Sequence, residues 1–472
     1  MRKTKIVCTL GPATDDENVL RKLMQAGMNV ARLNFSHGTH EEQKRRMDMV
    51  KKLRAELGLP IAILLDTKGP EIRTRDFEGG KVEVHAGDFF TLTTRELVGD
   101  STIASITYKD LYKDVQEGTH ILIDDGLIEL EVKSISDGDI LCTVITGGFI
   151  SNHKGINVPD VHLNMPYMSQ VDIDDVLFGI EQDVDFVAAS FVRSARDVLE
   201  LRELLDENGG KNINIISKIE NSEGVNHIDD IIYVSDGIMV ARGDMGVEIP
   251  GEEVPIVQKM IIRKVYNAGK QVITATQMLD SMIKNPRPTR AETTDVANAI
   301  YDGTSAIMLS GETAAGMYPV EAVETMVRIA ERTECDIDYR QNFFHYERKA
   351  NQNITDAICH AACTTAMDLN AAAIVIVTKS GRSARNISKY RPVCNIIAGT
   401  TSDKTSRQLN MSWGVTPIHL DEQKEIFELF DNAVLAGQKQ GLLATGDTVV
   451  VGAGVPLGVT GNTNMLKVQT VE

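Results

Sequence analysis

The residues of this sequence best suited to chemistry are Lys218, Glu220 and Asp244, because each lies at or just after the end of a short apolar run. Two carboxylates that converge without histidines favour a hard cation with oxygen ligands. Mg²⁺ takes one or two carboxylates and completes its shell with substrate oxygens and water. Lys218 and Arg32 could then hold phosphate oxygens. A metal ion together with fixed cations is what phosphoryl transfer requires. The alternative is a buried ion-pair network with a purely structural role.

A second group of oxygen-bearing side chains precedes these residues in the chain. It consists of Asn34, Ser36, Asp66 and Thr67. One carboxylate with amide and hydroxyl oxygens suits a monovalent cation better than Mg²⁺, and a plain hydrogen-bonded loop is the alternative. The chain contains no GxxxxGK[ST] loop and no HRD or DFG set, so phosphate must be held by side chains and a metal ion.

The elements that would position these residues follow a strand–helix alternation. Apolar, β-branched runs predict eight strands, at residues 4–9, 28–33, 61–65, 184–189, 213–218, 236–241, 270–275 and 304–309. Helix-length segments follow most of them, at 15–27, 39–57, 194–208, 252–268, 291–301 and 319–333. The predicted fold class is α/β, a TIM (β/α)8 barrel. Polar residues follow strands two, three, five, six, seven and eight, which places them on the C-terminal rim of such a barrel.

Two further units interrupt or follow this pattern. Residues 70–165 contain short alternating segments broken by Gly-Asp, Asp-Gly and Gly-Gly turns, which predict an inserted all-β domain. An insertion on the functional rim could act as a lid that excludes water. A new helix–strand alternation predicts a C-terminal doubly wound α/β domain. The expected domains are therefore a barrel (1–69 and 166–340), a β-rich lid (70–165) and a C-terminal domain (341–472).

Composition narrows the class of protein. The chain has 472 residues and a formal net charge of −18, which argues against a nucleic-acid partner. None of the six cysteines forms a CxxC pair. No apolar stretch approaches the ~18 residues that span a membrane. We expect a reduced, cytoplasmic enzyme with neither nucleic acid nor membrane as a partner.

Several motifs resemble those of the pyruvate kinase family. They are Thr4-Lys5-Ile6-Val7-Cys8-Thr9-Leu10-Gly11-Pro12, Ala31-Arg32-Leu33-Asn34-Phe35-Ser36-His37-Gly38, Leu65-Asp66-Thr67-Lys68-Gly69-Pro70, Ile216-Ser217-Lys218-Ile219-Glu220-Asn221, Val240-Ala241-Arg242-Gly243-Asp244 and Thr274-Ala275-Thr276-Gln277. The resemblance runs essentially end to end. It implies transfer of phosphate from phosphoenolpyruvate to ADP, giving pyruvate and ATP, by a homotetramer that uses Mg²⁺ (or Mn²⁺) and K⁺.

The resemblance also implies roles for individual residues. Lys218 resembles the lysine that stabilises the transferring phosphoryl group, and Glu220 and Asp244 resemble the Mg²⁺ ligands. The positions similar to catalytic or substrate-binding ones are Arg32, Lys218, Gly243, Asp244 and Thr276. Those similar to nucleotide-side positions are Asn34, His37, Arg73 and Lys154. Asn34, Ser36, Asp66 and Thr67 resemble the family's K⁺ site, and Glu71 resembles the acidic residue of K⁺-dependent members.

A loop of the C-terminal domain resembles the family's effector loop. It comprises Thr378, Lys379, Ser380, Gly381, Arg382 and Ser383, and residues 452–458 could form the facing loop. Backbone N–H groups at a helix N-terminus suit a phosphate, and an ordinary helix N-cap is the alternative. The resemblance implies a sugar phosphate or AMP as allosteric effector. We expect no extra C-terminal domain. The sequence does not identify the group that donates the proton to enolpyruvate. Two rival functions remain: another barrel enzyme that acts on phosphoenolpyruvate or a 2-oxo acid, and a non-catalytic effector-sensing protein.

Overall fold

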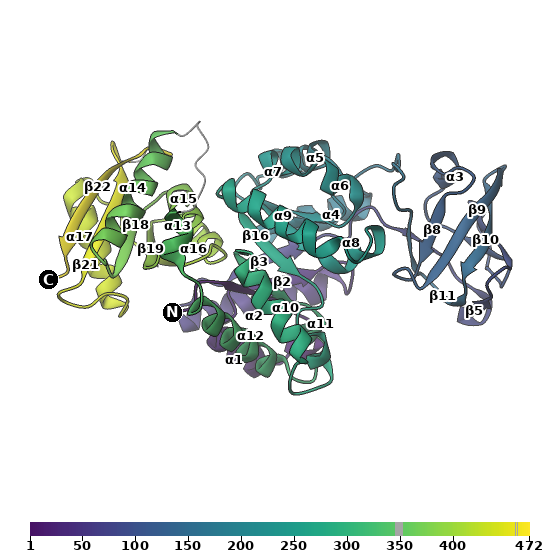
Figure 1. Ribbon diagram of the computed structural model, residues 1–472, viewed down its shortest axis with the longest axis horizontal. Helices are drawn as coiled ribbons and strands as arrows, with labels where there is room; N and C mark the ends of the chain where they lie inside the picture. Colours follow the sequence, from purple (N-terminus) through teal and green to yellow (C-terminus); the bar gives the residue numbers. More distant parts are fainter. Residues whose placement is uncertain (345–352, 458, 460) are drawn as a thin grey trace.

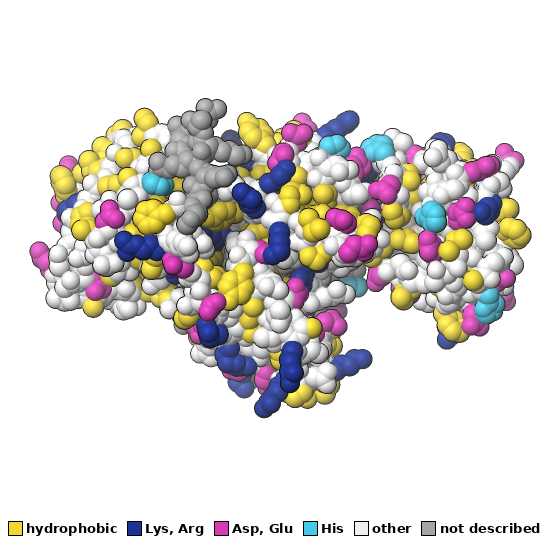
Figure 2. Space-filling model, in the orientation of Figure 1, with side chains coloured by type: hydrophobic (Ala, Val, Ile, Leu, Met, Phe, Trp, Pro, Cys, Tyr) yellow, Lys and Arg dark blue, Asp and Glu magenta, His cyan; other side chains and the backbone are white. Residues whose placement is uncertain are grey.

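The computed structural model describes residues 1–344, 353–457, 459 and 461–472. Residues 345–352, 458 and 460 lie outside the described residues, so one residue of the predicted facing loop, Gly458, is not placed. Figure 1 shows three parts side by side: a barrel in the centre, a β-rich part on the right and a sheet flanked by helices on the left. Acidic and basic side chains are spread over all three parts on this face (Figure 2).

Eight parallel strands close the central barrel in the order β1-β17-β16-β15-β14-β13-β3-β2. They are β1 (Lys5–Thr9), β2 (Val30–Asn34), β3 (Ala62–Asp66), β13 (Phe186–Ala189), β14 (Asn214–Ile219), β15 (Gly237–Ala241), β16 (Gln271–Ala275) and β17 (Ala306–Leu309). The barrel predicted from the alternation is thereby confirmed. Strand two begins at Val30 rather than at Met28, because helix α1 (Glu17–Ala26) ends just before it and its C-cap Gly27, with a φ of 129°, turns the backbone ahead of the strand.

Helices surround this barrel. The longer ones are α1 (Glu17–Ala26), α2 (His40–Leu57), α4 (Gln170–Glu181), α5 (Ala195–Glu207), α9 (Val254–Asn267), α10 (Arg290–Tyr301) and α12 (Pro319–Glu334). Shorter ones are α6 (Ser222–Asn226), α7 (Ile228–Val234), α8 (Arg242–Glu248) and α11 (Gly311–Ala314). Helix α13 (Tyr339–Phe344) instead packs against the C-terminal part through Phe343. No described helix is both long and apolar enough to cross a bilayer.

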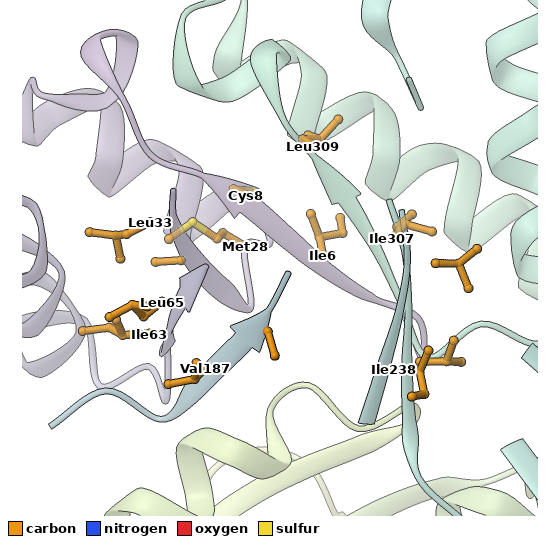
Figure 3. Packing of buried hydrophobic residues seen from close by; sticks show 14 of the residues in the cluster. Ile6, Cys8, Met28, Leu33, Ile63, Leu65, Val187, Ile238, Ile307 and Leu309 are labelled. Atoms are coloured by element: carbon orange, nitrogen blue, oxygen red, sulfur yellow. The ribbon is translucent and has the colours of Figure 1, made fainter. Parts of the chain in front are cut away.

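Alternate residues of each barrel strand face two different cores. Ile6 and Cys8 of β1 pack between the strands and the surrounding helices, as Figure 3 shows with their neighbours. Val7, between them, belongs to the cluster inside the barrel, where it joins Met239. This inner cluster also includes Met411, which comes from the C-terminal part of the chain. The barrel interior is therefore filled with apolar side chains, which leaves polar chemistry to the strand ends.

The segment between β3 and α4 forms a separate β structure, here called the β insert (Ile72–Asn157). Its larger sheet has the order β4-β12-β8-β9-β10-β6-β7, and β11 pairs with β5. The strands are β4 (Ile72–Arg73), β5 (Lys81–Val84), β6 (Phe89–Thr93), β7 (Ile103–Ser105), β8 (His120–Ile123), β9 (Ile128–Ser136), β10 (Asp139–Thr146), β11 (Gly148–Ser151) and β12 (Gly155–Asn157), with helix α3 (Leu111–Asp114). The insert has its own apolar core.

The C-terminal part is a five-stranded sheet of order β20-β19-β18-β21-β22, in which only β22 runs antiparallel to its neighbour. Its elements are α14 (Ile354–Asp368), β18 (Ala373–Val377), α15 (Arg382–Lys389), β19 (Asn395–Thr400), α16 (Asp403–Leu409), β20 (Val415–His419), α17 (Ile426–Lys439), β21 (Thr448–Gly454) and β22 (Thr463–Thr470). It meets the N-terminal end of the barrel, where Lys5 Nζ donates to the carbonyl of Val415 at 2.7 Å. The opposite end of the barrel faces the β insert.

Candidate active site

Three charged side chains from strands β2, β3 and β14 meet at the C-terminal end of the barrel. Asp66, the last residue of β3, accepts hydrogen bonds from Arg32 Nε at 2.6 Å and from Lys218 Nζ at 3.0 Å. Arg32 Nη1 also donates to Thr9 Oγ1 at 2.9 Å. Asp66 is fully buried and Lys218 is 8% exposed. The carboxylate therefore fixes two cations that come from strands on either side of it.

The charges in this cluster stabilise one another. Although burial opposes ionisation of Asp66, the Arg32 and Lys218 cations lower the pKa of its carboxyl. Burial also opposes the charge on Lys218, but the carboxylates of Asp66 and Glu220 raise the pKa of its ammonium above the ordinary lysine value. Lys218 is therefore a cation at neutral pH and is largely buried from solvent.

Glu220 lies two residues beyond Lys218, just after the end of β14. Its Oε1 lies 3.0 Å from Lys218 Nζ, and its Oε2 accepts a hydrogen bond from the amide of Phe191 at 2.6 Å. Burial raises the pKa of Glu220 to about 7; the Lys218 cation counteracts this shift, whereas the Asp244 carboxylate adds to it. A buried carboxylate with a raised pKa gains from a cation bound beside it.

Asp244 stands in the first turn of α8, which begins directly after β15. Its neighbour Gly243 donates its amide hydrogen to Thr276 Oγ1 at 2.7 Å, and this hydroxyl donates in turn to the carbonyl of Ala275 at 2.6 Å. Thr276 has a φ of 68°, which is unusual for a β-branched residue. The ends of β15 and β16 are thus joined through the Thr276 hydroxyl, whose proton points to a backbone carbonyl.

The four residues of the predicted monovalent-cation set lie at the ends of two neighbouring strands. Asn34 and Asp66 are register partners in β2 and β3. Asn34 Oδ1 accepts from the amide of Ser36 at 3.1 Å, and Thr67 Oγ1 accepts from the amide of Ser190 at 3.2 Å. The set is therefore brought together, with one carboxylate and several neutral oxygens.

A cleft of about 300 Å³ lies between the barrel rim and the β insert. Its lining includes Arg73, Lys154 and Asp244. Arg73 Nε donates to Glu71 at 2.7 Å, and Lys154 forms an ion pair with Asp124 at 2.8 Å. Two of the predicted nucleotide-side residues, Asn34 and His37, are not among the residues that line this cleft. His37 is exposed in the loop between β2 and α2.

Comparison with known families accounts for almost the whole chain. Residues 1–323 match the family model described as pyruvate kinase, barrel domain, and residues 356–469 match the one described as pyruvate kinase, alpha/beta domain. The chain belongs to the pyruvate kinase family. It is thus an ATP:pyruvate 2-O-phosphotransferase, whose substrates are phosphoenolpyruvate and ADP.

Individual relatives agree with this assignment. The chain is 55% identical to a pyruvate kinase of Clostridium acetobutylicum, with 100% of both chains covered. It is 53% identical to a pyruvate kinase of Sporosarcina psychrophila, with 100% of this chain and 81% of the relative covered. The crystal structure of a pyruvate kinase from Cryptosporidium parvum superposes with a TM-score of 0.95 at 40% identity, covering 100% of this chain and 96% of that one.

Pyruvate kinases are metal-dependent. No cluster of three or more His, Cys, Asp or Glu side chains suited to a metal occurs in the described ranges. Glu220 and Asp244 are two carboxylates at neighbouring strand ends, and such a pair could hold a cation with oxygen ligands when substrate oxygens and water complete its shell.

The predicted effector loop borders a second cavity, of about 460 Å³, in the C-terminal sheet. Four of its six predicted residues line this cavity: Thr378, Lys379, Ser380 and Ser383. Gly381, with a φ of 77°, instead forms the N-cap of α15, and Arg382 is exposed at the start of that helix. Ala453, Gly454 and Leu457 line the cavity from the other side, as expected of the facing loop.

The sequence analysis selected no functional residue at the C-terminal end of strand β13. Ser190 and Phe191 follow this strand directly and contact Lys218 and Glu220, respectively. The rule used for the other strands, that polar residues just beyond an apolar run lie on the rim, selects Ser190 when it is applied to the run 184–189.

Proposed function

We propose that phosphoenolpyruvate transfers its phosphoryl group to ADP in the cleft between Lys218 and the β insert, as the final step of glycolysis in the cytoplasm. The observation that carries this proposal is the buried Lys218 ammonium, 3.0 Å from both Asp66 and Glu220. A cation fixed in a site with little water stabilises the charge that develops on a transferring phosphoryl group without reorganising first.

The basic and the acidic residues of the site have different roles in this proposal. Lys218 and Arg32 hold phosphoryl oxygens, while Glu220 and Asp244 hold Mg²⁺ or Mn²⁺. When bound, this ion supplies electrostatic neutralisation of the phosphoryl oxygens. Gly243 and Thr276 complete the substrate-binding surface at the ends of β15 and β16.

The donor of the proton to enolpyruvate is better sought in water than in Thr276. The Thr276 hydroxyl donates its hydrogen to the Ala275 carbonyl at 2.6 Å and accepts from Gly243. A hydroxyl committed in this way cannot donate to the substrate unless the turn rearranges. We therefore propose a water molecule as the immediate donor.

We propose that K⁺ binds among Asn34, Ser36, Asp66 and Thr67. The supporting observation is the register of β2 and β3, in which Asn34 is the partner of Asp66, whose neighbour Thr67 adds a further oxygen. The test compares rates in K⁺, in Na⁺ and in a large organic cation at equal ionic strength. We expect a high rate only in K⁺, and equal rates would rule out the site.

ADP is proposed to bind on the side of Arg73 and Lys154, with Asn34 and His37 reaching it from the barrel loops. Closure of the β insert as a lid would bring these two groups together and exclude water. The proposed domains are the barrel (1–69 and 166–340), the lid (70–165) and a regulatory domain (341–472). We further propose a homotetramer in which the cavity at Thr378–Ser383 binds a sugar phosphate or AMP.

The decisive assay is the formation of pyruvate and ATP from phosphoenolpyruvate and ADP. We expect turnover that needs both substrates and a divalent cation. Pyruvate formation without ADP would point to a different enzyme acting on phosphoenolpyruvate, and no turnover with intact folding would point to a non-catalytic homologue.

A further inference from the structure

Ser190 joins the two halves of the charged cluster. It follows β13 directly and is 1% exposed. Its Oγ accepts a hydrogen bond from Lys218 Nζ at 2.8 Å and lies 2.6 Å from the carbonyl oxygen of Thr67 and 3.2 Å from Asp66 Oδ1. A serine hydroxyl carries one hydrogen, so it donates to the nearer acceptor, Thr67 O. The result is a directed chain from Lys218 through Ser190 to Thr67.

The backbone around Ser190 leaves this hydroxyl little freedom. Tyr167 Oη donates to the carbonyl of Ser190 at 3.1 Å. A side chain built on Gly69 would come within 2.8 Å of the Ser190 Cβ, which shows how closely the two loops pack. The next amide, of Phe191, is bonded to Glu220. The backbone that carries the Ser190 hydroxyl is therefore fixed at its carbonyl and at the following amide, and it packs closely against the loop at Gly69.

We propose that Ser190 is a positioning residue, which sets the Lys218 ammonium and couples it to the monovalent-cation pocket. The proposal rests on the proposed function, because it assigns Thr67 and Asp66 to that pocket. Lys218 has two carboxylate partners, which attract it away from an incoming phosphoryl group. The Ser190 hydroxyl supplies a neutral third acceptor that fixes the direction of the ammonium. It also fixes the Thr67 carbonyl, an oxygen well suited to K⁺.

The chain offers a matched control in Ser217, which precedes Lys218 on β14. Ser217 is also fully buried, but its hydroxyl bonds that of Ser235 at 2.7 Å, whereas the Lys218 ammonium donates to Ser190. Ser190→Ala and Ser217→Ala therefore each remove one buried hydroxyl close to the lysine. Only the first removes a contact of the ammonium.

The experiment measures steady-state kinetics against phosphoenolpyruvate and against K⁺, with thermal unfolding, for the full-length wild type and both variants. For Ser190→Ala we expect kcat to fall about 10- to 100-fold, because small misplacements of catalytic groups have effects of this size. KM for phosphoenolpyruvate should change much less. The K⁺ concentration for half-activation should rise roughly 2- to 10-fold, the equivalent of one hydrogen bond. Ser217→Ala should keep wild-type kcat and K⁺ activation.

The possible outcomes distinguish a failure of the role proposed for Ser190 from a failure of the proposed function. A wild type without ADP-dependent turnover contradicts the proposed function. An active wild type with Ser190→Ala unchanged in kcat and K⁺ activation overturns the role of Ser190. A variant that loses stability and kcat together, with unchanged K⁺ activation, shows a structural role only and overturns it as well. If Ser190→Ala does not fold, Ser190→Cys replaces it, and a wild-type K⁺ response in that variant also contradicts the proposal.

Discussion

Replacing Asp66 by Asn tests whether this carboxylate holds the charged cluster together. Asn has nearly the same shape but no charge, so Arg32 and Lys218 stay buried with their shared counter-ion removed. Removing one partner of a buried ion pair costs about 3–5 kcal/mol. Lys218 retains Glu220 and Arg32 retains Thr9, which favours the lower end of this range.

This loss is large enough to measure by thermal unfolding. For a domain of the size of the barrel, about 3 kcal/mol corresponds to a fall in Tm of roughly 6–12 °C. The effect should be constant at neutral pH. The lowered pKa of Asp66 means that its stabilising contribution is present above about pH 4 and is lost only as the pH falls through the folded-state pKa.

The matched control is Asp48→Asn, which breaks an exposed pair. Lys44 and Asp48 lie 2.6 Å apart, but their side chains are 50% and 52% exposed. Such a pair contributes about 0.5 kcal/mol or less. Differential scanning calorimetry at one scan rate compares both variants with the wild type. If Asp66→Asn shifts Tm no more than Asp48→Asn does, Asp66 is not the counter-ion of this cluster and the electrostatic reasoning fails.

Three further predictions concern the metal, the domain contact and the effector. Glu220→Ala removes one of two proposed magnesium ligands, so it should raise the Mg²⁺ concentration for half-maximal rate and lower kcat; an unchanged Mg²⁺ titration contradicts the assignment. Burial lowers the pKa of Lys5 to about 7, below that of an unfolded lysine, so the unfolded chain binds more protons between pH 7 and about pH 10 and stability should rise with pH there. Lys5→Met should remove this rise in Tm, and an identical pH profile in both proteins refutes the shift. Lys379→Ala should abolish activation by whichever of AMP and a panel of sugar phosphates activates the wild type, while leaving the basal rate unchanged; full activation of the variant would exclude Lys379.

The barrel and the identity of most rim residues could be predicted because the pattern is local. Each strand is a short apolar run, and each functional side chain stands within a few residues of its end. The pattern does not predict which of these side chains contact one another. Asp66 could be predicted to lie near Arg32 and Lys218, but not that its two oxygens each accept a hydrogen bond from one of these cations, which lie 34 and 152 residues away. Such contacts depend on how the closed barrel sets its register.

Helix α4 was not among the predicted helices, for a different reason. Its acidic residues Asp172 and Asp175 are buried, whereas Val171 is 56% exposed. Asp172 bonds the amide of Gly69, and Asp175 pairs with His40 at 2.5 Å. The usual amphipathic pattern is weakened because these carboxylates share the buried face with Val176 and support the loops that follow β3 and β2. No periodicity rule recovers a helix that buries acids to hold functional loops.

The central claim is that the Lys218 ammonium stabilises the transferring phosphoryl group, and single-turnover ATP formation by Lys218→Met tests it most directly. Rapid mixing of saturating phosphoenolpyruvate, ADP, Mg²⁺ and K⁺ with the variant isolates the chemical step. We predict a rate at least about 100-fold below that of the wild type, since one lost electrostatic contact at a transition state costs this much. The exposed Lys211→Met variant should keep the wild-type rate, and circular dichroism should show both variants folded. A folded Lys218→Met protein that forms ATP at the wild-type rate would contradict the account.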